Sequence, residues 1–405
     1  MSSKVAVLGF GTVGSGTVEI LENNAAEIKK RSGADVELKY IVDIADFPDS
    51  PYADKLIKSI DTVLEDDEIE IVAECIGGIG KAYEFTKKLL SKGISVVTPN
   101  KELVAKKGAE LLQLAEDNGC CYMFEASVGG AIPIIRPLRR CLAGNIIRSM
   151  AGIVNGTTNF ILHKMITESM SFDDALKLAQ ELGYAERNPS ADVDGHDACR
   201  KIAILSDLAY GKEVNPDKIY TEGISKLTLQ DVAYADAFGA KIKLIASVKL
   251  LENGSILPMV RPAVVPLSNM LSGVNDVFNA VSVIGDAAGE LMFYGRGAGK
   301  LPTASAIVAD IADIASHKCD RMPIAWTPSE DDSFIADYLD DSVRMYVRIK
   351  GTDIGFIKSV LGSDIIILPK LCEGETAVVT SLMTDRELDE KLRSLDVIGR
   401  IRIYE

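Results

Sequence analysis

The first third of the chain alternates short apolar runs with longer segments of helical periodicity. The short runs are rich in Val and Ile, as in buried strands, and lie at 4–8, 36–42, 70–75, 94–97 and 121–124. Between them, segments such as 81–92 and 102–118 repeat apolar residues every three to four positions and are predicted to be helices. This order predicts an α/β fold with an N-terminal doubly wound parallel sheet, which binds ligands at the carboxyl ends of its strands.

A glycine-rich turn follows the first apolar run and precedes a predicted helix that extends to about Lys30. Its sequence is Gly9-Phe10-Gly11-Thr12-Val13-Gly14. The glycines allow a sharp turn and let a pyrophosphate approach the N–H groups at the helix start. In this context the motif predicts binding of NAD or NADP, and a tight strand-to-helix turn is the alternative interpretation.

The second predicted strand ends at Asp43, where an acidic residue would accept hydrogen bonds from the ribose hydroxyls of NAD. Residues 44–49 contain no Arg or Lys, so a 2′-phosphate would meet Asp43 and Asp46 without a cation. We therefore expect NAD to be favoured over NADP. The alternative is that Asp43 is only a solvated strand end.

Three later strand ends also carry polar groups. Lys101 begins a predicted helix, where a cation interacts unfavourably with the helix dipole. A functional role and a structural role of Lys101 are therefore equal alternatives. Glu125 precedes a Gly-Gly turn. Asn155-Gly156-Thr157-Thr158-Asn159 opens a predicted helix at 160–166, and its amides and hydroxyls could bind an anion or form an ordinary N-cap.

The most densely charged stretch is 183–201. It ends in a predicted helix at 197–205, with Asp194 as the expected N-cap. Asp197 and Lys201 stand four positions apart and share one face of this helix. A solvated salt bridge is the simple interpretation, and an acid–base pair that acts on a substrate is the functional one.

Composition excludes several classes of function. The 405 residues carry a net charge of −15, which argues against a nucleic-acid partner. No apolar run reaches the roughly 18 residues of a membrane span, so no membrane partner is expected. Seven cysteines without a Cys-x-x-Cys pair indicate free thiols and a cytoplasmic location, and three scattered histidines do not form a zinc site.

The C-terminal part follows an acidic, turn-rich linker at 326–341. From 342 to 405 the pattern predicts strands and helices in the order βαββαβ. This order resembles an ACT domain, a small ligand-sensing module, although Thr352-Asp353-Ile354-Gly355 replaces the usual acidic-Pro-Gly entry. The resemblance implies an amino-acid effector at this domain.

The ordered motifs of residues 1 to 320 resemble those of homoserine dehydrogenases. The specific pieces are the Asn-Gly-Thr-Thr-Asn sequence and the stretch 183–201, supported by the glycine loop, Thr98-Pro99-Asn100-Lys101, Glu125 to Gly130, and Gly295 to Ala304. The resemblance implies NAD(P)-dependent interconversion of homoserine and aspartate 4-semialdehyde in the biosynthesis of threonine, methionine and isoleucine. It also implies a homodimer or higher homo-oligomer.

The same resemblance implies a role for each matching residue. Lys201 and Lys101 would carry proton transfer and substrate polarisation, and Asp197 would assist them at the substrate hydroxyl. Substrate binding would involve Glu186, Asp192, Asn155, Gly156 and Thr157, and Gly297 would contact the cofactor together with Lys101. A monovalent cation such as Na⁺ would bind Glu125 and the carbonyls of Val128, Gly130 and Ile132.

The implied domains are a nucleotide-binding Rossmann domain at 1–130, to which 296–325 return, and an α+β catalytic and dimerisation domain at 131–295. The second domain would contain a mixed sheet, to which the strand-like runs at 241–251, 256–260 and 278–284 would belong. Two other classes of protein stay open: another Rossmann-fold amino-acid dehydrogenase or reductase, and a non-catalytic nucleotide or amino-acid sensor. A sensor has no need for Lys101, Glu186, Asp197 and Lys201 together.

Overall fold

The computed structural model describes residues 2–317 and 325–404 and contains two compact units. The first unit comprises Met1–Ile146, Ala203–Pro216 and Phe293–Glu330, and the second comprises Ile147–Ile202, Asp217–Met292 and Asp331–Glu405.

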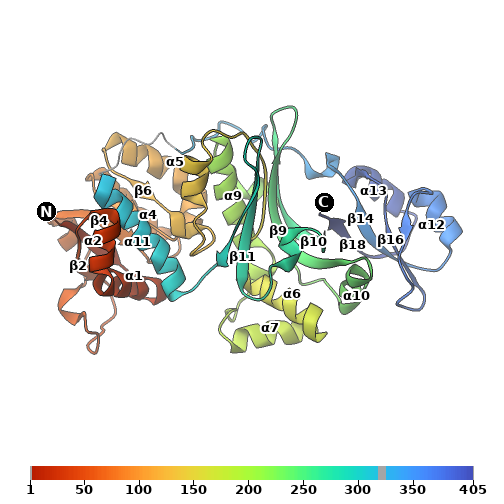
Figure 1. Ribbon diagram of the computed structural model, residues 1–405, viewed down its shortest axis with the longest axis horizontal. Helices are drawn as coiled ribbons and strands as arrows, with labels where there is room; N and C mark the ends of the chain where they lie inside the picture. The colour runs from red at the N-terminus through yellow and green to blue at the C-terminus, as the bar shows by residue number, and fades with distance from the viewer. Residues whose placement is uncertain (1, 318–324, 405) are drawn as a thin grey trace. The chain divides into compact units, whose positions relative to one another are not determined.

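The first unit is built on a six-stranded parallel sheet with the strand order β3-β2-β1-β4-β5-β6 (Figure 1). The predicted doubly wound parallel sheet is thereby confirmed. Val5, Val7 and Ile71 are fully buried in its core, which explains the continuous apolar runs. The strands are β1 (Ser3–Leu8), β2 (Val36–Val42), β3 (Leu56–Ile57), β4 (Ile69–Glu74), β5 (Ser95–Val97) and β6 (Tyr122–Met123).

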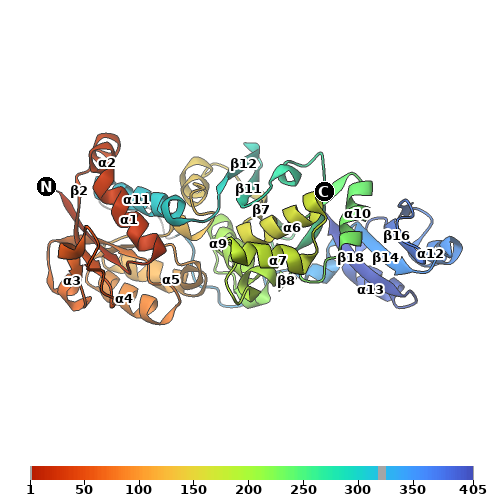
Figure 2. The same ribbon diagram turned by 90° about the horizontal axis from the view of Figure 1, so that it is seen from below.

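Helices cover both faces of this sheet. Figure 2 shows α1 and α11 side by side on one face, whereas α4 and α5 pack together on the other. The single helix expected up to Lys30 is two helices, because Asn24 leaves helical geometry at φ −110° and ψ 12°. The helices are α1 (Thr12–Asn23), α2 (Ala25–Ser32), α3 (Asp61–Glu65), α4 (Gly80–Ser91), α5 (Lys101–Asp117) and α11 (Lys300–His317).

The second unit is built on a mixed sheet, as expected, in the order β12-β11-β7-β9-β10-β18-β14-β16-β15, with β8 on β10. The C-terminal strands extend this sheet, because β18 pairs in parallel with β10 through Ala263–Arg402 and Val264–Ile403. The strands that precede the linker at 326–341 are called the catalytic-region strands, because the resemblance implies a catalytic domain there. They are β7 (Ile147–Ile153), β8 (Tyr220–Thr221), β9 (Ala240–Leu250), β10 (Ile256–Pro266), β11 (Phe278–Gly285) and β12 (Gly289–Arg296).

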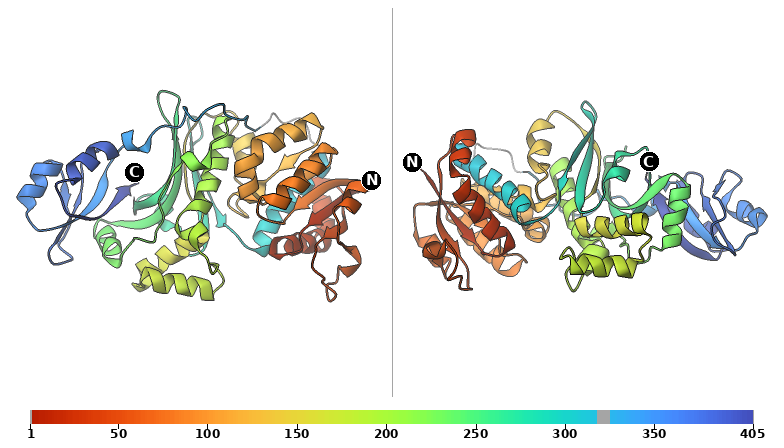
Figure 3. Two further views of the ribbon diagram at one scale, coloured as in Figure 1. Left: turned by 180° about the vertical axis from the view of Figure 1, so that it is seen from behind. Right: turned by 60° about the horizontal axis from the view of Figure 1, so that its bottom comes forward.

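Five helices accompany these strands. Figure 3 shows α6 and α7 as a packed pair in yellow-green. The helix α9 starts in the second unit and ends in the first, since the boundary falls after Ile202. The helices are α6 (Gly156–Glu168), α7 (Phe172–Glu181), α8 (Ser190–Val193), α9 (His196–Tyr210) and α10 (Leu229–Ala237).

The C-terminal segment has the predicted βαββαβ order. Its elements are β14 (Met345–Lys350), α12 (Ile354–Leu361), β15 (Ile366–Ile367), β16 (Glu375–Val379), α13 (Asp385–Leu392) and β18 (Val397–Ile403). The first strand of this order is interrupted at Arg344, since β13 (Ser342–Val343) pairs separately with β17 (Met383–Thr384). Met345, Val347 and Leu388 are fully buried in its core.

One expectation from composition is wrong. Cys121 is disulfide-bonded, although the absence of a Cys-x-x-Cys pair indicated free thiols. A disulfide depends on the distance between two side chains in space, which spacing along the chain does not reveal. Among the residues that the structure describes, five cysteines are free thiols: Cys75, Cys120, Cys141, Cys199 and Cys372. None of the helices within 2–317 and 325–404 has the length and apolarity to cross a bilayer.

Candidate active site

The glycine loop has the geometry that a dinucleotide requires. A Cβ at Gly14 would lie 1.8 Å from the carbonyl oxygen of Gly9, and Gly9 itself has φ +90°. Both positions therefore exclude a side chain for steric reasons. A Cβ at Gly11 would meet no atom within 4 Å, so the space beside it is open. The first N–H groups of α1 have no acceptor within the helix and can bind a phosphate.

Asp43 supports this loop from the end of β2. Its Oδ2 accepts from the N–H of Phe10 at 2.7 Å, and its Oδ1 accepts from the N–H of Ala45 at 2.8 Å. A carboxylate has about four lone-pair positions, so two can still receive ribose hydroxyls. The carboxylate is thus fixed in place, and its contact with a ribose stays a prediction.

A cation that the local sequence did not reveal lies next to residues 44–46. The ammonium of Lys58 donates to the carbonyl of Ala45 at 2.6 Å and forms an ion pair with Asp46 at 2.6 Å. Lys58 follows β3, which pairs with β2 and brings it there. The charge of Asp46 is partly neutralised by this ammonium. Asp46 would therefore repel a 2′-phosphate less strongly than the sequence indicated.

Lys101 is the first residue of α5, and a buried network positions it. The Oδ1 of Asn100 caps α5 by accepting from the N–H of Leu103 at 3.1 Å. The Thr98 hydroxyl donates to Glu74 at 2.7 Å and accepts from the N–H of Asn100 at 2.9 Å. Glu74 is fully buried, and burial raises its pKa. The role of Glu74 in positioning Lys101 was not predicted. The acidic residue at the end of an apolar run was the sequence feature that could have indicated it.

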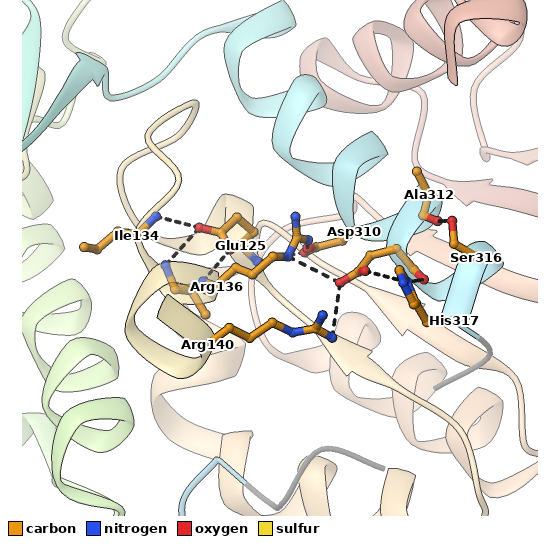
Figure 4. Close-up of polar contacts among 10 residues, drawn as sticks. Glu125, Ile134, Arg136, Arg140, Asp310, Ala312, Ser316 and His317 are labelled. Atoms are coloured by element: carbon orange, nitrogen blue, oxygen red, sulfur yellow. Dashed lines mark hydrogen bonds and ion pairs between the residues drawn. The ribbon is translucent and has the colours of Figure 1, made fainter. Parts of the chain in front are cut away.

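Glu125 is buried and its carboxylate accepts three backbone N–H groups (Figure 4). Its Oε1 accepts from Ile134 at 2.7 Å and Ile135 at 2.9 Å, and its Oε2 accepts from Arg136 at 2.8 Å. These bonds leave about one lone-pair position for a cation. The carboxylate therefore anchors the residues that directly follow the loop 128–132, whose carbonyls would be the other ligands.

The helix α11 holds this loop from the other side. Asp310 accepts from the N–H of Glu125 at 2.9 Å and from the guanidinium of Arg136 at 2.6 Å (Figure 4). Burial and the neighbouring Glu125 raise the pKa of Asp310 to about 7, although Arg136 opposes the shift. Gly297 lies against the same loop, since a Cβ at Gly130 would be 2.5 Å from its carbonyl oxygen.

In the second unit, Lys201 and Asp197 form a buried ion pair at 2.7 Å, with side chains only 9% and 4% exposed. The Lys201 ammonium also donates to the carbonyl of Val154 at 2.7 Å. This burial contradicts the simple interpretation of a solvated surface salt bridge. A buried pair needs hydrogen bonds to offset its desolvation, and the surrounding residues provide them.

Asn155 joins this pair to a second acid. Its amide donates to Asp197 at 2.9 Å and to Asp192 at 2.7 Å. Its Oδ1 caps α6 by accepting from the N–H of Thr158 at 2.9 Å. The N-cap interpretation of Asn155 is therefore correct. It does not exclude an anion, because Gly156 and Thr157 are the first residues of α6, where N–H groups lack helical acceptors.

In two details the structure differs from the site that the sequence predicted. The hydroxyls of Thr157 and Thr158 donate to protein carbonyls, that of Thr157 to Tyr184 at 2.7 Å, so backbone amides are the main donors for an anion. Glu186 lies on an exposed loop between α7 and α8, where its backbone carbonyl accepts from the Gln180 amide at 3.1 Å.

The helix α9 begins at His196, and the residue that caps it differs from the expected one. Gly195, not Asp194, precedes it, since its carbonyl accepts from the N–H of Cys199 at 2.9 Å. Gly195 has φ +86°, and a Cβ there would lie 3.0 Å from the side chain of Thr221. The turn into α9 therefore requires glycine, and Asp194 instead ends α8.

Family models match most of the chain. The model described as "Homoserine dehydrogenase, NAD binding domain" matches residues 9–125, and "Homoserine dehydrogenase" matches residues 133–312. The chain is similar to the homoserine dehydrogenase of Pseudomonas aeruginosa, with 39% identity over 99% of this chain and 96% of the relative. That of Neisseria gonorrhoeae is 37% identical over 96% of this chain and 93% of the relative.

Solved structures agree. A homoserine dehydrogenase from Thiobacillus denitrificans matches with a TM-score of 0.89 and 36% identity, covering 100% of this chain and 99% of that chain. A hyperthermophilic archaeal homoserine dehydrogenase in complex with NADPH matches with a TM-score of 0.65 and 29% identity, covering 80% of this chain and 100% of that chain. With the glycine loop and the buried Lys201–Asp197 pair, these matches show that the chain belongs to the homoserine dehydrogenase family.

Proposed function

We propose that the chain interconverts L-homoserine and L-aspartate 4-semialdehyde with a nicotinamide cofactor, as a step in threonine, methionine and isoleucine biosynthesis. The observation that supports this most strongly is the buried Lys201–Asp197 pair, which Asn155 links to the start of α6. A non-catalytic sensor has no use for such a desolvated cation. Another amino-acid dehydrogenase would need different groups around Lys201.

The roles follow from the charges of homoserine. The N–H groups of Gly156 and Thr157 suit its carboxylate, and the acids Glu186 and Asp192 suit its ammonium. Lys201 suits its reacting oxygen: an ammonium donates a proton to the alkoxide that forms when the aldehyde is reduced, or stabilises its charge. Asp197 and the Val154 carbonyl orient this ammonium.

The first unit would hold the cofactor, which supplies or accepts the hydride when bound. The glycine loop from Gly9 to Gly14 would bind its pyrophosphate, and Asp43 its adenosine ribose. Lys101 would polarise the substrate oxygen and contact the cofactor, with Gly297 as a further cofactor contact. Glu125 and the carbonyls of Val128, Gly130 and Ile132 would hold a monovalent cation such as Na⁺, which fits the remaining lone pair of Glu125.

The assembly and regulation are proposed on the resemblance alone. We propose a homodimer or higher homo-oligomer formed by the catalytic region, and an amino-acid effector at the ACT-like segment after the linker at 326–341. The proposed domains are 1–130 with 296–325, 131–295, and 342–405, and the protein would act in the cytoplasm.

The function itself predicts a direct result. The purified chain should form NADH or NADPH when L-homoserine is added, and should consume it with aspartate 4-semialdehyde. L-Threonine and L-serine, matched in charge, are the control substrates. A folded protein without turnover on homoserine with either cofactor would exclude the proposal.

For the cofactor, we propose that NAD is used at least as well as NADP, because Asp46 engages Lys58. Asp46→Asn should release the Lys58 ammonium toward a 2′-phosphate and raise kcat/KM with NADP about three- to tenfold, with little change for NAD. Asp49→Asn, in the same loop, is the matched control. Unchanged NADP kinetics in Asp46→Asn would show that Lys58 does not reach the phosphate.

A further inference from the structure

A pocket of about 230 Å³, lined by both apolar and charged side chains, lies in the second unit, where the C-terminal strands join the catalytic-region sheet. Strands β9 and β10 form one wall, and β18 continues it. The segment 341–344 forms another side. Its polar lining residues include Ser149, Ser247, Lys249, Arg261, Arg344 and Arg402. None of these six belongs to the proposed catalytic or cofactor-binding set.

Cations outnumber acids around this pocket. Four basic side chains line it, and Asp341 is its one acidic lining residue in the ranges that the structure describes. Asp341 forms ion pairs with both Lys249 and Arg402. Arg261 pairs with Asp385 at 3.1 Å. Two carboxylates therefore pair with three of the four cations.

Arg261 also holds a donor that no acceptor satisfies. Its side chain is only 6% exposed, its guanidinium carbon lies 5.5 Å from the centre of the Tyr220 ring, and its Nε has no hydrogen-bond partner within the described residues. Buried N–H donors in native proteins are nearly always paired, so an unpaired Nε on a residue that lines the pocket favours a ligand or water close to that side chain.

The cations oppose one another. Burial and the neighbouring Arg261 lower the pKa of Arg402 to about 9. Burial and Arg402 lower the pKa of Lys249. An anion in the pocket would reduce this repulsion and supply the missing acceptor.

We propose that this pocket binds a small oxyanion, a carboxylate or phosphate, between Arg261 and Lys249 of the catalytic-region strands and Arg344 and Arg402 of the C-terminal segment. Guanidinium groups match the two oxygens of a carboxylate or phosphate, and the hydroxyls of Ser149 and Ser247 add donors. The ligand would link the two halves of the sheet. This inference does not depend on the proposed catalytic function.

The test is calorimetric titration of the full chain with inorganic phosphate and, separately, with succinate. Ionic strength is kept constant with chloride, and saturating NADH occupies the glycine loop. We expect one saturable site for at least one of the two anions. Preference for phosphate or for succinate then identifies the chemical source of the ligand.

Lys249→Met and Arg344→Gln test the location, because both side chains are partly exposed and removing either leaves Arg261 and Arg402 in place. Each should weaken binding about tenfold, the loss of one charge-assisted hydrogen bond. The control is Lys350→Met, an exposed cation on β14 outside the pocket, which should not change the affinity. Absence of saturable binding by both anions, or equal affinity in all variants, would refute the proposal. Melting temperatures establish that each variant is folded.

Discussion

Lys201→Ala should lower kcat for homoserine oxidation by about 10² to 10⁴, because the ammonium that transfers the proton or stabilises the alkoxide is lost. The KM for homoserine should change much less, since Asn155, Asp192 and the amides at the start of α6 remain. Steady-state kinetics with saturating cofactor measure both constants.

The stability of the Lys201→Ala variant does not distinguish a catalytic Lys201 from a purely structural one. Removal of Lys201 leaves Asp197 buried without its cation, and such changes cost about 3–5 kcal/mol. Kinetics must therefore be measured below the melting temperature of the variant. Lys201→Arg should restore the charge but not full activity, because a guanidinium does not release its proton at working pH.

A matched control is available on α6. Lys164 pairs with Glu168 at 2.5 Å across one helical turn, as Lys201 pairs with Asp197, but more of it is exposed. Lys164→Ala should lose at most about 1 kcal/mol of stability and leave kcat unchanged. If Lys201→Ala kept turnover within a few-fold of the parent, the proton chemistry would have to be assigned to Lys101.

Two alanine substitutions in the glycine loop should have opposite effects. One should weaken cofactor binding without lowering stability, and the other should lower stability. Gly11→Ala adds a Cβ in open space at φ −71°, so the fold should keep its stability. The added methyl group would occupy the space where the pyrophosphate approaches the backbone, so the KM for the cofactor should rise at least tenfold. Isothermal titration with NADH measures the same loss without turnover.

Gly14→Ala should instead damage the fold. Its Cβ would overlap the carbonyl oxygen of Gly9, and overpacking of this kind costs about 1–3 kcal/mol or more. Thermal unfolding should show a lower melting temperature for Gly14→Ala and an unchanged one for Gly11→Ala. Normal cofactor affinity in Gly11→Ala would mean that the dinucleotide does not cross the loop at this position.

Local patterns predicted those features that depend on neighbouring residues. The Val- and Ile-rich runs predicted the parallel strands, because strands covered on both faces have no polar side. The spacing of Asp197 and Lys201 predicted their contact, because one helical turn brings such residues together. In the C-terminal segment, alternation and helical periodicity were sufficient for the βαββαβ order.

Features that depend on tertiary packing were not predicted. Lys58 reaches residues 44–46 only because β3 pairs with β2, and no local spacing encodes that pairing. The burial of the Lys201–Asp197 pair depends on the Val154 carbonyl and Asn155, which come from distant positions in the chain. The expected strand at 256–260 continues to Pro266, because β9 pairs with β10 along the whole length of β10. The prolines of β10 do not interrupt this pairing.

The pairing of β18 with β10 has a consequence for truncation. A chain that ended before β14 would leave the backbone N–H and C=O groups at Ala263 and Val264 facing solvent instead of Arg402 and Ile403. Such an open edge recruits strands from other molecules. The C-terminal segment thus covers this edge of the β10 strand, and its removal would favour edge-to-edge pairing between chains.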